Sequence, residues 1–558
     1  MAMKKLTAAF CALLLLLLFL PVFAYVIFQG TRMDYYAIYK ILTLYDNVAL
    51  IAAAVCGGVL VCLLYGLLKR LPVNRYTLAG SVVFILLFCA AFYLIGAEVC
   101  KCIAFYGGWD CGMVANSARW VYEGSGLGYD DYYTIYSNNV PITWLLYQLY
   151  SLAERMPGYA YHPEFMWIQF QCLMFALAVL FSALIPLVAV KSIALSGTVL
   201  LVSGLLLGLT PWKIIPYTDG STIAVAVFLI FLYAVFQKMR SKLKYVLWAL
   251  LILAGVLGGI MKATCYVTLI AIVLVDAVWS VFGKEAVKQK LLSMGMKALV
   301  LLAACLLAVA CKNGMYQDLH YQYDADMEMT WTNYMYNGLN EANTGTVSGD
   351  GLSIVRAYAG YPREVRVAVE VQYIKDRIRE KGIAGLLDFW LRKQVMNYND
   401  GTFSWYQEGF FQAWEYEDIT DSRYQEPLRQ FYWQDGSNYL WFTTISQGLW
   451  LFVLLGVIVE AGVLLVTVIR SFRKDDTENT EDSTLALRTI GTVIFIGVFL
   501  FVMLFEGRAR YLFNHIPVFA VTAVSGYCQL AEYSIHLLKR VKGTVKNNRK
   551  NNRQGEIK

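Results

Sequence analysis

Charged residues are scarce in this chain of 558 residues: Asp, Glu, Lys and Arg make up 16% of it, whereas hydrophobic residues make up 58%. Average soluble domains contain about 25% charged residues. Apolar runs of about 20 residues, the length that spans a bilayer, recur here from one end to the other. The scarcity of charge therefore excludes an ordinary soluble protein and indicates a chain embedded in a lipid bilayer.

Metal-binding patterns are also missing from the sequence. It has only 4 histidines, and its 12 cysteines show no zinc-type spacing with them. Most of the cysteines lie within apolar runs, where a thiol behaves as a small hydrophobic group. Paired acidic ligands are not evident either. We therefore expect no metal and no cofactor, and a divalent metal has no support in the sequence.

Twelve apolar segments come close to the length of a membrane crossing. A hydrocarbon core about 30 Å thick needs about 20 helical residues, because a helix rises about 1.5 Å per residue and satisfies its own backbone hydrogen bonds in lipid. The predicted spans are approximately 8–29, 48–68, 78–99, 165–190, 193–210, 220–237, 245–261, 264–282, 297–312, 444–469, 487–505 and 514–537. The predicted fold class is thus an all-α polytopic membrane protein with about 12 transmembrane helices.

The basic residues of the short loops predict the orientation, because cytoplasmic loops retain Lys and Arg. They fall on one side if both termini are cytoplasmic: Lys4, Lys5, Lys69, Arg70, Arg75, Lys191, Lys238, Arg240, Lys242, Lys244, Lys284, Lys288, Lys290, Arg470, Arg473, Lys474 and the tail from Lys539. The net charge of +7 follows this distribution. It indicates contact with membrane lipid headgroups and no nucleic-acid partner. A cleaved signal peptide is the alternative for residues 1–29.

Two long stretches between the spans fall outside the membrane in this topology. We call residues 100–164 the first long segment and residues 313–443 the second long segment. Short interfacial helices are predicted at 111–123 and 141–154 in the first, and longer ones at about 363–381 and 383–396 in the second. The predicted divisions are 1–99 (three spans), 100–164, 165–312 (spans four to nine), 313–443, 444–538 (spans ten to twelve) and 539–558 (basic cytoplasmic tail).

Charged residues next to apolar segments at the outer membrane edge need a partner or a use, because charge is disfavoured there. The predicted outer edge carries Asp110, Asp219, Lys262, Glu506, Arg508 and Arg510. Each carboxylate of Asp110 and Asp219 has the alternative role of a helix cap. The ammonium of Lys262 lies on the outer side, which is contrary to the preference for positive charge on the cytoplasmic side. The guanidinium groups suit phosphate, with pairing to Glu506 as the alternative.

A sugar transfer from a lipid phosphate uses such a set of residues. The departing phosphate needs cations to stabilise its developing charge, and the acceptor hydroxyl needs one carboxylate to take its proton. The second long segment is also rich in Trp and Tyr. Aromatic faces pack well on sugar rings, although membrane-interface belts collect the same residues.

The chain resembles the C-type, multi-spanning glycosyltransferase superfamily, in particular bacterial protein O-mannosyltransferases and lipid A aminoarabinose transferases. The resemblance rests on GGWDCGMVANSA, DDYYTIYSNNVP, IPYTDGS, GGIMKAT and EGRARYLFNHIP, which occur in this order between residues 100 and 520. The sequence departs from the family in having Cys111 directly after Asp110 and in the length of its second long segment.

The resemblance implies a role for each matching position. Asp110 would be the catalytic base and Asp219 a supporting carboxylate of the catalytic site. The donor phosphate would be bound by Lys262, Arg508 and Arg510. The substrate path would be lined by Tyr133, Tyr136, Asn138, Asn139 and Tyr511.

The expected function is therefore an inverting glycosyltransferase in the cell membrane of a bacterium, with its active site on the extracytoplasmic face. Its partners would be a polyprenyl-phosphate sugar donor and an acceptor hydroxyl on an extracytoplasmic glycan, lipid or protein. A transporter or lipid flippase is the first alternative. It would place ionisable residues near mid-span, whereas the mid-span positions here are mostly Leu, Val, Ile and Ala. A non-catalytic envelope assembly protein is the second alternative.

Overall fold

The computed structural model describes residues 2–29, 42–156, 162, 164–416, 420, 422–472 and 482–555, with side chains up to residue 535. Within these ranges the fold is all-helical, and an isolated bridge joins Phe105 to Glu415.

The first helices are α1 (Ala2–Gln29), α2 (Asn47–Leu68), α3 (Arg75–Ile103), α4 (Trp109–Tyr122), α5 (Asp130–Ile135), η2 (Ser137–Asn139), α6 (Val140–Glu154), α7 (Glu164–Val190), α8 (Ile193–Leu209), η3 (Pro211–Ile214), α9 (Thr218–Ser221), α10 (Val225–Lys238) and α11 (Lys244–Met261). The remaining helices are α12 (Cys265–Val281), α13 (Val287–Asp318), α14 (Trp331–Gly338), α15 (Gly349–Ala357), α16 (Arg363–Tyr398), η4 (Trp405–Gln407), η5 (Gly409–Phe411), α17 (Gln425–Tyr432), α18 (Tyr439–Phe472), α19 (Asp482–Leu504), η6 (Ala509–His515) and α20 (Ile516–Gly555).

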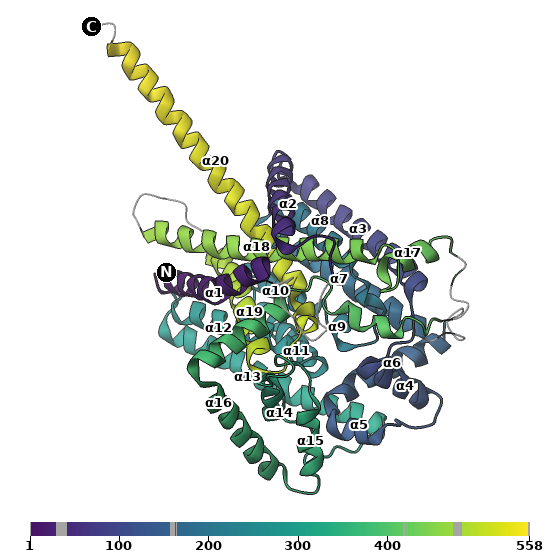
Figure 1. The fold of residues 1–558 in the computed structure, drawn as a ribbon. Coiled ribbons are helices and arrows are strands. Elements are labelled where there is room, and N and C mark those ends of the chain that lie inside the picture. The colour runs from purple at the N-terminus through teal and green to yellow at the C-terminus, as the bar shows by residue number, and fades with distance from the viewer. Residues whose placement is uncertain are drawn as a thin grey trace.

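Each predicted span coincides with a helix. Nine helices of the described part are long and apolar enough to cross a membrane: α1, α2, α3, α7, α9 with α10, α11, α13, α18 and α19. Two more predicted spans form α8 and α12, which are shorter at 17 residues each. The last predicted span begins α20, which continues as a helix into the basic tail and extends away from the helical body (Figure 1). The number of twelve crossings stays a prediction.

Several helices begin at side chains that accept the free backbone N–H groups of the first turn. Asp46 accepts from the amide of Ala49 at the start of α2. Asn74 and Thr77 form a reciprocal capping box at the start of α3. Ser192 caps α8 by accepting a hydrogen bond from the amide of Leu195. These polar residues thus mark where apolar helices begin.

The long helices pack around α18, which contacts α1, α2 and α20 (Figure 1). Glycines let α18 and α20 approach closely, as small residues do in membrane helix pairs. A Cβ atom on Gly526 would lie 2.6 Å from the backbone nitrogen of Glu460, and one on Gly456 would lie 2.5 Å from the Cβ of Ala523. A larger side chain at either position would force the two helices apart.

The two long segments form one unit at one end of the bundle, where α4, α5, α14 and α15 lie (Figure 1). The backbone N–H of Met329 donates to the carbonyl of Ile135 at 2.9 Å, and the hydroxyl of Ser137 bonds to the carboxylate of Glu328. The predicted helices of the first segment are confirmed as α4 and α6. Those of the second are confirmed as well: α16 consists of two helices that meet at a kink at Gly382, whose backbone angles are non-helical (φ 59°, ψ −178°).

Lys393 fixes the second long segment to the end of α19. Its buried ammonium donates to the carbonyl of Gly338 at 2.7 Å and to that of Phe505 at 2.6 Å. It also donates to the carbonyl of Met503 at 3.2 Å. Cations are favoured at helix C-termini, where backbone carbonyls lack partners. The residues that follow α19 are therefore held against α14.

The expectation that unusual charges lie at the outer helix ends is incomplete. A buried ion pair joins Glu460 of α18 to Arg488 of α19, and another joins Asp276 of α12 to Lys297 of α13 at 2.5 Å. Hydropathy could not show these pairs, because each partner lies on a different helix. Pairing is what allows a charge to remain inside a helical bundle.

Candidate functional site

The candidate site is a cavity of about 1400 Å³ between the two long segments and the adjoining helix ends. Its wall includes side chains from the start of α4, the loop between α11 and α12, and the segment between α19 and α20. Eight of the ten predicted site residues line it: Asp110, Tyr136, Asn138, Asn139, Lys262, Arg508, Arg510 and Tyr511. The other two, Asp219 and Tyr133, are buried behind or beside it.

Asp110 lies at the end of a chain of hydrogen bonds. The hydroxyl of Tyr132 donates to its Oδ1 at 2.9 Å, and the amide of Asn139 donates to that hydroxyl at 2.6 Å. The hydroxyl of Tyr217 in turn donates to Oδ1 of Asn139 at 2.9 Å. Burial raises the pKa of Tyr132 far above its usual range, and Tyr217 and Asp110 raise it further. Tyr132 thus remains a proton donor that holds the carboxylate of Asp110 in place.

The alternative role of Asp110 as a helix cap does not describe its position. The residue that caps α4 is Gly108, and Asp110 lies within the first turn. An acidic residue there is still favoured by the helix dipole. Its carboxylate is half-buried on the cavity wall, so it faces both the dipole and the open space.

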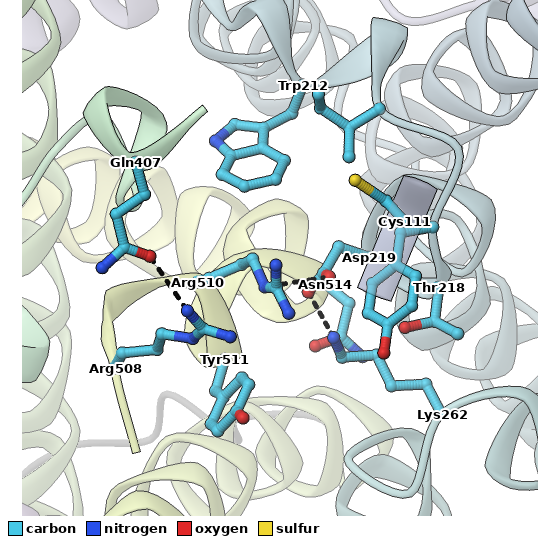
Figure 2. Close-up of polar contacts among 12 residues, drawn as sticks. Cys111, Trp212, Thr218, Asp219, Lys262, Gln407, Arg508, Arg510, Tyr511 and Asn514 are labelled. Carbon is cyan, nitrogen blue, oxygen red and sulfur yellow. Dashed lines mark hydrogen bonds and ion pairs between the residues drawn. The ribbon is translucent and has the colours of Figure 1, made fainter. Parts of the chain in front are cut away.

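Asp219 forms ion pairs with two cations of the cavity wall (Figure 2). Lys262 donates a hydrogen bond to its Oδ1, and Nε of Arg510 lies 3.4 Å from its Oδ2. Asp219 is 1% exposed and sits inside the short helix α9, after the cap residue Tyr217. Burial lowers the pKa of Lys262, an effect that the carboxylate opposes. Asp219 therefore stabilises two charges that face the cavity and has no direct place on its wall.

Arg508 differs from the other two cavity cations. Its guanidinium donates to the side-chain oxygen of Gln407 at 2.9 Å (Figure 2). Within the described part of the chain it has no carboxylate partner. Glu506, the predicted alternative partner, instead accepts a hydrogen bond from Tyr511 at 2.7 Å. Among the described residues the guanidinium of Arg508 thus forms no ion pair, and it lines the cavity, where a ligand can reach it.

The neighbouring tyrosines Tyr132 and Tyr133 face different surroundings. Helix α5 starts directly after Tyr129, whose backbone is left-handed (φ 48°). Because the helix starts at this residue, the side chain of Tyr132 points to Asp110. The side chain of Tyr133 is fully buried and shares a hydrogen bond of 2.7 Å with Thr143. Tyr136, Asn138 and Asn139 follow toward the cavity.

Glu408 is a further charged group that sequence patterns did not identify. It follows Gln407 and is 1% exposed. Burial raises the pKa of its carboxyl to about 7, although Arg510 and Arg508 lower it. Its Oε2 has no hydrogen-bond partner among the described residues. It lies in an irregular loop without periodicity, so only the fold reveals that it is close to the cavity cations.

The described residues contain no ready set of metal ligands. No group of three His, Cys, Asp or Glu side chains there comes together as a metal site. Asp219, one of the carboxylates close to the cations, is paired with Lys262 and Arg510.

The comparisons with known proteins identify a family of membrane proteins. A family model described as "conserved hypothetical integral membrane protein" matches residues 2–528. No curated protein and no solved structure matches the chain. The match covers most of the 558 residues. The chain therefore belongs to this family of conserved hypothetical integral membrane proteins, and its apolar helices make it a multi-pass member.

Proposed function

We propose that this protein is an inverting membrane glycosyltransferase. It transfers a sugar from a polyprenyl-phosphate donor to a hydroxyl group of an extracytoplasmic glycan, lipid or protein. It acts in a bacterial cell membrane with both termini in the cytoplasm, so that the two long segments and the cavity face the outside. The observation that carries this proposal is one cavity with a carboxylate, Asp110, and three cations, Lys262, Arg508 and Arg510, on its wall.

The cations suit a lipid-linked phosphate in position and in charge. Lys262 ends α11, and Arg508 and Arg510 follow α19, so all three lie at the ends of apolar helices. A phosphate headgroup reaches this depth while its polyprenyl chain remains in the bilayer. Arg508 forms no ion pair with the described residues, and Asp219 holds the other two cations in place. Preorganised cations stabilise charge that develops on a leaving group.

The reaction needs one bond to form and one to break. The acceptor oxygen attacks the anomeric carbon, and the bond from that carbon to the phosphate oxygen breaks. The electron pair leaves with the polyprenyl phosphate, whose charge the three cations stabilise. The acceptor proton moves to the carboxylate of Asp110, which Tyr132 orients. Attack opposite the leaving phosphate inverts the anomeric configuration.

The first experiment compares wild type with Asp110→Asn, each purified as the full chain and placed in matched membranes. Both receive a panel of radiolabelled polyprenyl-phosphate sugars with crude envelope acceptor, and the label released from the lipid is followed. Asp131→Asn is the matched control, because Asp131 is an exposed carboxylate of α5. We expect Asp110→Asn to lose at least about a hundredfold in rate, the scale of a general base, and Asp131→Asn to match wild type.

Two results would contradict the proposal. Equal release by Asp110→Asn and wild type would remove Asp110 from the reaction. Absence of release from every donor would favour a transporter or lipid flippase, for which the buried ion pair between Glu460 and Arg488 is the relevant feature. That alternative is then tested by following labelled lipid across the bilayer with Glu460→Gln.

A further inference from the structure

Three large aromatic side chains of the cavity wall are exposed. Trp109 at the start of α4 is 62% exposed, Trp331 at the start of α14 is 60% exposed, and Phe410 of η5 is 74% exposed. They come from both long segments. Single exposed apolar side chains are common, but several of them around one cavity indicate a binding site.

The backbone at Trp109 is strained in a way that presents its ring. Trp109 has φ 48°, a left-handed conformation that a bulky residue rarely adopts. The ring rests edge-on against Phe411, with centroids 5.3 Å apart, and lies beside Phe410. Phe411 itself is buried and fills the space next to Gly108. Strain of this kind persists where the surrounding structure enforces it, typically at functional sites.

Amide side chains accompany the aromatic rings on the wall. Asn138, Asn337, Gln407 and Gln434 all line the cavity. Amides donate and accept hydrogen bonds without carrying charge. Aromatic faces with neutral amides match the two surfaces of a sugar, its C–H faces and its hydroxyl edges. The charged residues Lys262, Arg508 and Arg510 instead match the phosphate of the donor.

The cavity is also larger than the donor headgroup requires. Sites for small ligands usually measure about 300–1,000 Å³, and this cavity measures about 1400 Å³. One sugar phosphate leaves room for further groups next to the aromatic rings. A chain of several sugars uses both the volume and two aromatic positions, the adjoining rings of Trp109 and Phe410 and the ring of Trp331 on α14.

We infer that Trp109, Phe410 and Trp331 form a binding site for an oligosaccharide, which is the acceptor of the transfer. This inference rests on the proposed function and narrows its acceptor to a glycan. The rings stack on successive sugars, while Asn138 and Gln407 bind hydroxyl groups. The terminal acceptor hydroxyl then lies beside Asp110, the residue that follows Trp109.

The test is a binding experiment that needs no donor and no turnover. Full-length protein in lipid nanodiscs is applied to an array of defined oligosaccharides, and the best ligand is titrated. We expect saturable binding that weakens at least about tenfold in Trp109→Ala and in Trp331→Ala. Phe replacements at both positions keep most of the affinity, because the ring is retained. Gel filtration and thermal unfolding confirm that each variant is folded.

The matched control is Trp441→Ala. Trp441 of α18 is 50% exposed and is not among the residues that line the cavity. Its replacement is expected to leave binding within about twofold of wild type. An equal loss in Trp441→Ala would assign the aromatic residues to the membrane interface and overturn the inference.

Further outcomes distinguish this inference from the proposed function. Binding of no oligosaccharide, or saturable binding of a Ser/Thr-rich peptide in place of glycans, would overturn the glycan acceptor even if donor sugar is released. Aromatic-dependent glycan binding without any release from lipid donors would support the binding site and refute the transferase.

Discussion

Replacing Glu408 by Gln is predicted to stabilise the protein above neutral pH. Burial raises the pKa of the Glu408 carboxyl from 4.5 to about 7. At about 1.36 kcal/mol per pKa unit, this difference corresponds to about 3 kcal/mol between the folded and the unfolded chain. The amide of Gln has a similar shape and never ionises.

The change of stability with pH follows from the difference between the folded and the unfolded pKa of Glu408. The folded pKa lies above the unfolded value, so the stability from the protonated carboxyl is fully present below about pH 4.5 and is lost as pH rises through about 7. Wild type and Glu408→Gln are therefore expected to unfold at similar temperatures at pH 5. At pH 8.5 the variant is expected to be the more stable by up to about 3 kcal/mol.

The assay is thermal unfolding of the detergent-solubilised full chain, followed at several values of pH between 5 and 8.5. Glu364→Gln is the control, because Glu364 is an exposed carboxylate of α16. Parallel pH curves for wild type and Glu408→Gln would refute the reasoning. A variant that is less stable at pH 8.5 would mean that attraction to Arg508 and Arg510 outweighs the cost of burial.

Four further predictions concern the cavity. Asp219→Asn leaves two buried cations without their carboxylate and is expected to cost about 3–5 kcal/mol, measured as a lower unfolding temperature. Tyr132→Phe removes the hydrogen bond that holds the carboxylate of Asp110 in place, so turnover is expected to fall while the unfolding temperature stays close to that of wild type. Arg508→Ala is expected to lower turnover about 10²–10³-fold, and Arg508→Lys to recover part of the loss because the charge is kept. Treatment with EDTA is expected to leave transfer unchanged, since the chain supplies its own cations; loss of transfer that Mg²⁺ or Mn²⁺ restores would disprove this.

Hydropathy predicted the helices well, because the length of an apolar run sets whether it can span a bilayer. Hydropathy predicted two other features less well: spans whose helices are short, and charges that stay buried because they pair between helices. The predicted spans at 193–210 and 264–282 form helices of 17 residues. Glu460 and Arg488 remain buried only because each lies opposite the other, on helices whose pairing no single segment encodes.

The candidate site was predictable where charge stands against an apolar background. Asp110, Lys262, Arg508 and Arg510 stood out for this reason, and all four line the cavity. Tyr132 did not stand out from Tyr133, because a one-residue difference in the start of a short helix decides which ring faces Asp110. Glu408, Trp109 and Trp331 lie in or beside irregular loops, where sequence periodicity gives no direction to a side chain.

The wall of the cavity unites residues from distant parts of the chain: Asp110 follows the third helix, whereas Arg508 and Arg510 precede the last. A ribosome makes Asp110 early and the two arginines almost at the end. During elongation, the chain therefore has the carboxylate and the aromatic rings of the cavity long before the guanidinium groups that share its wall. The cavity is thus completed only when most of the chain has been made, and a premature stop before Arg508 would leave its wall without both guanidinium groups.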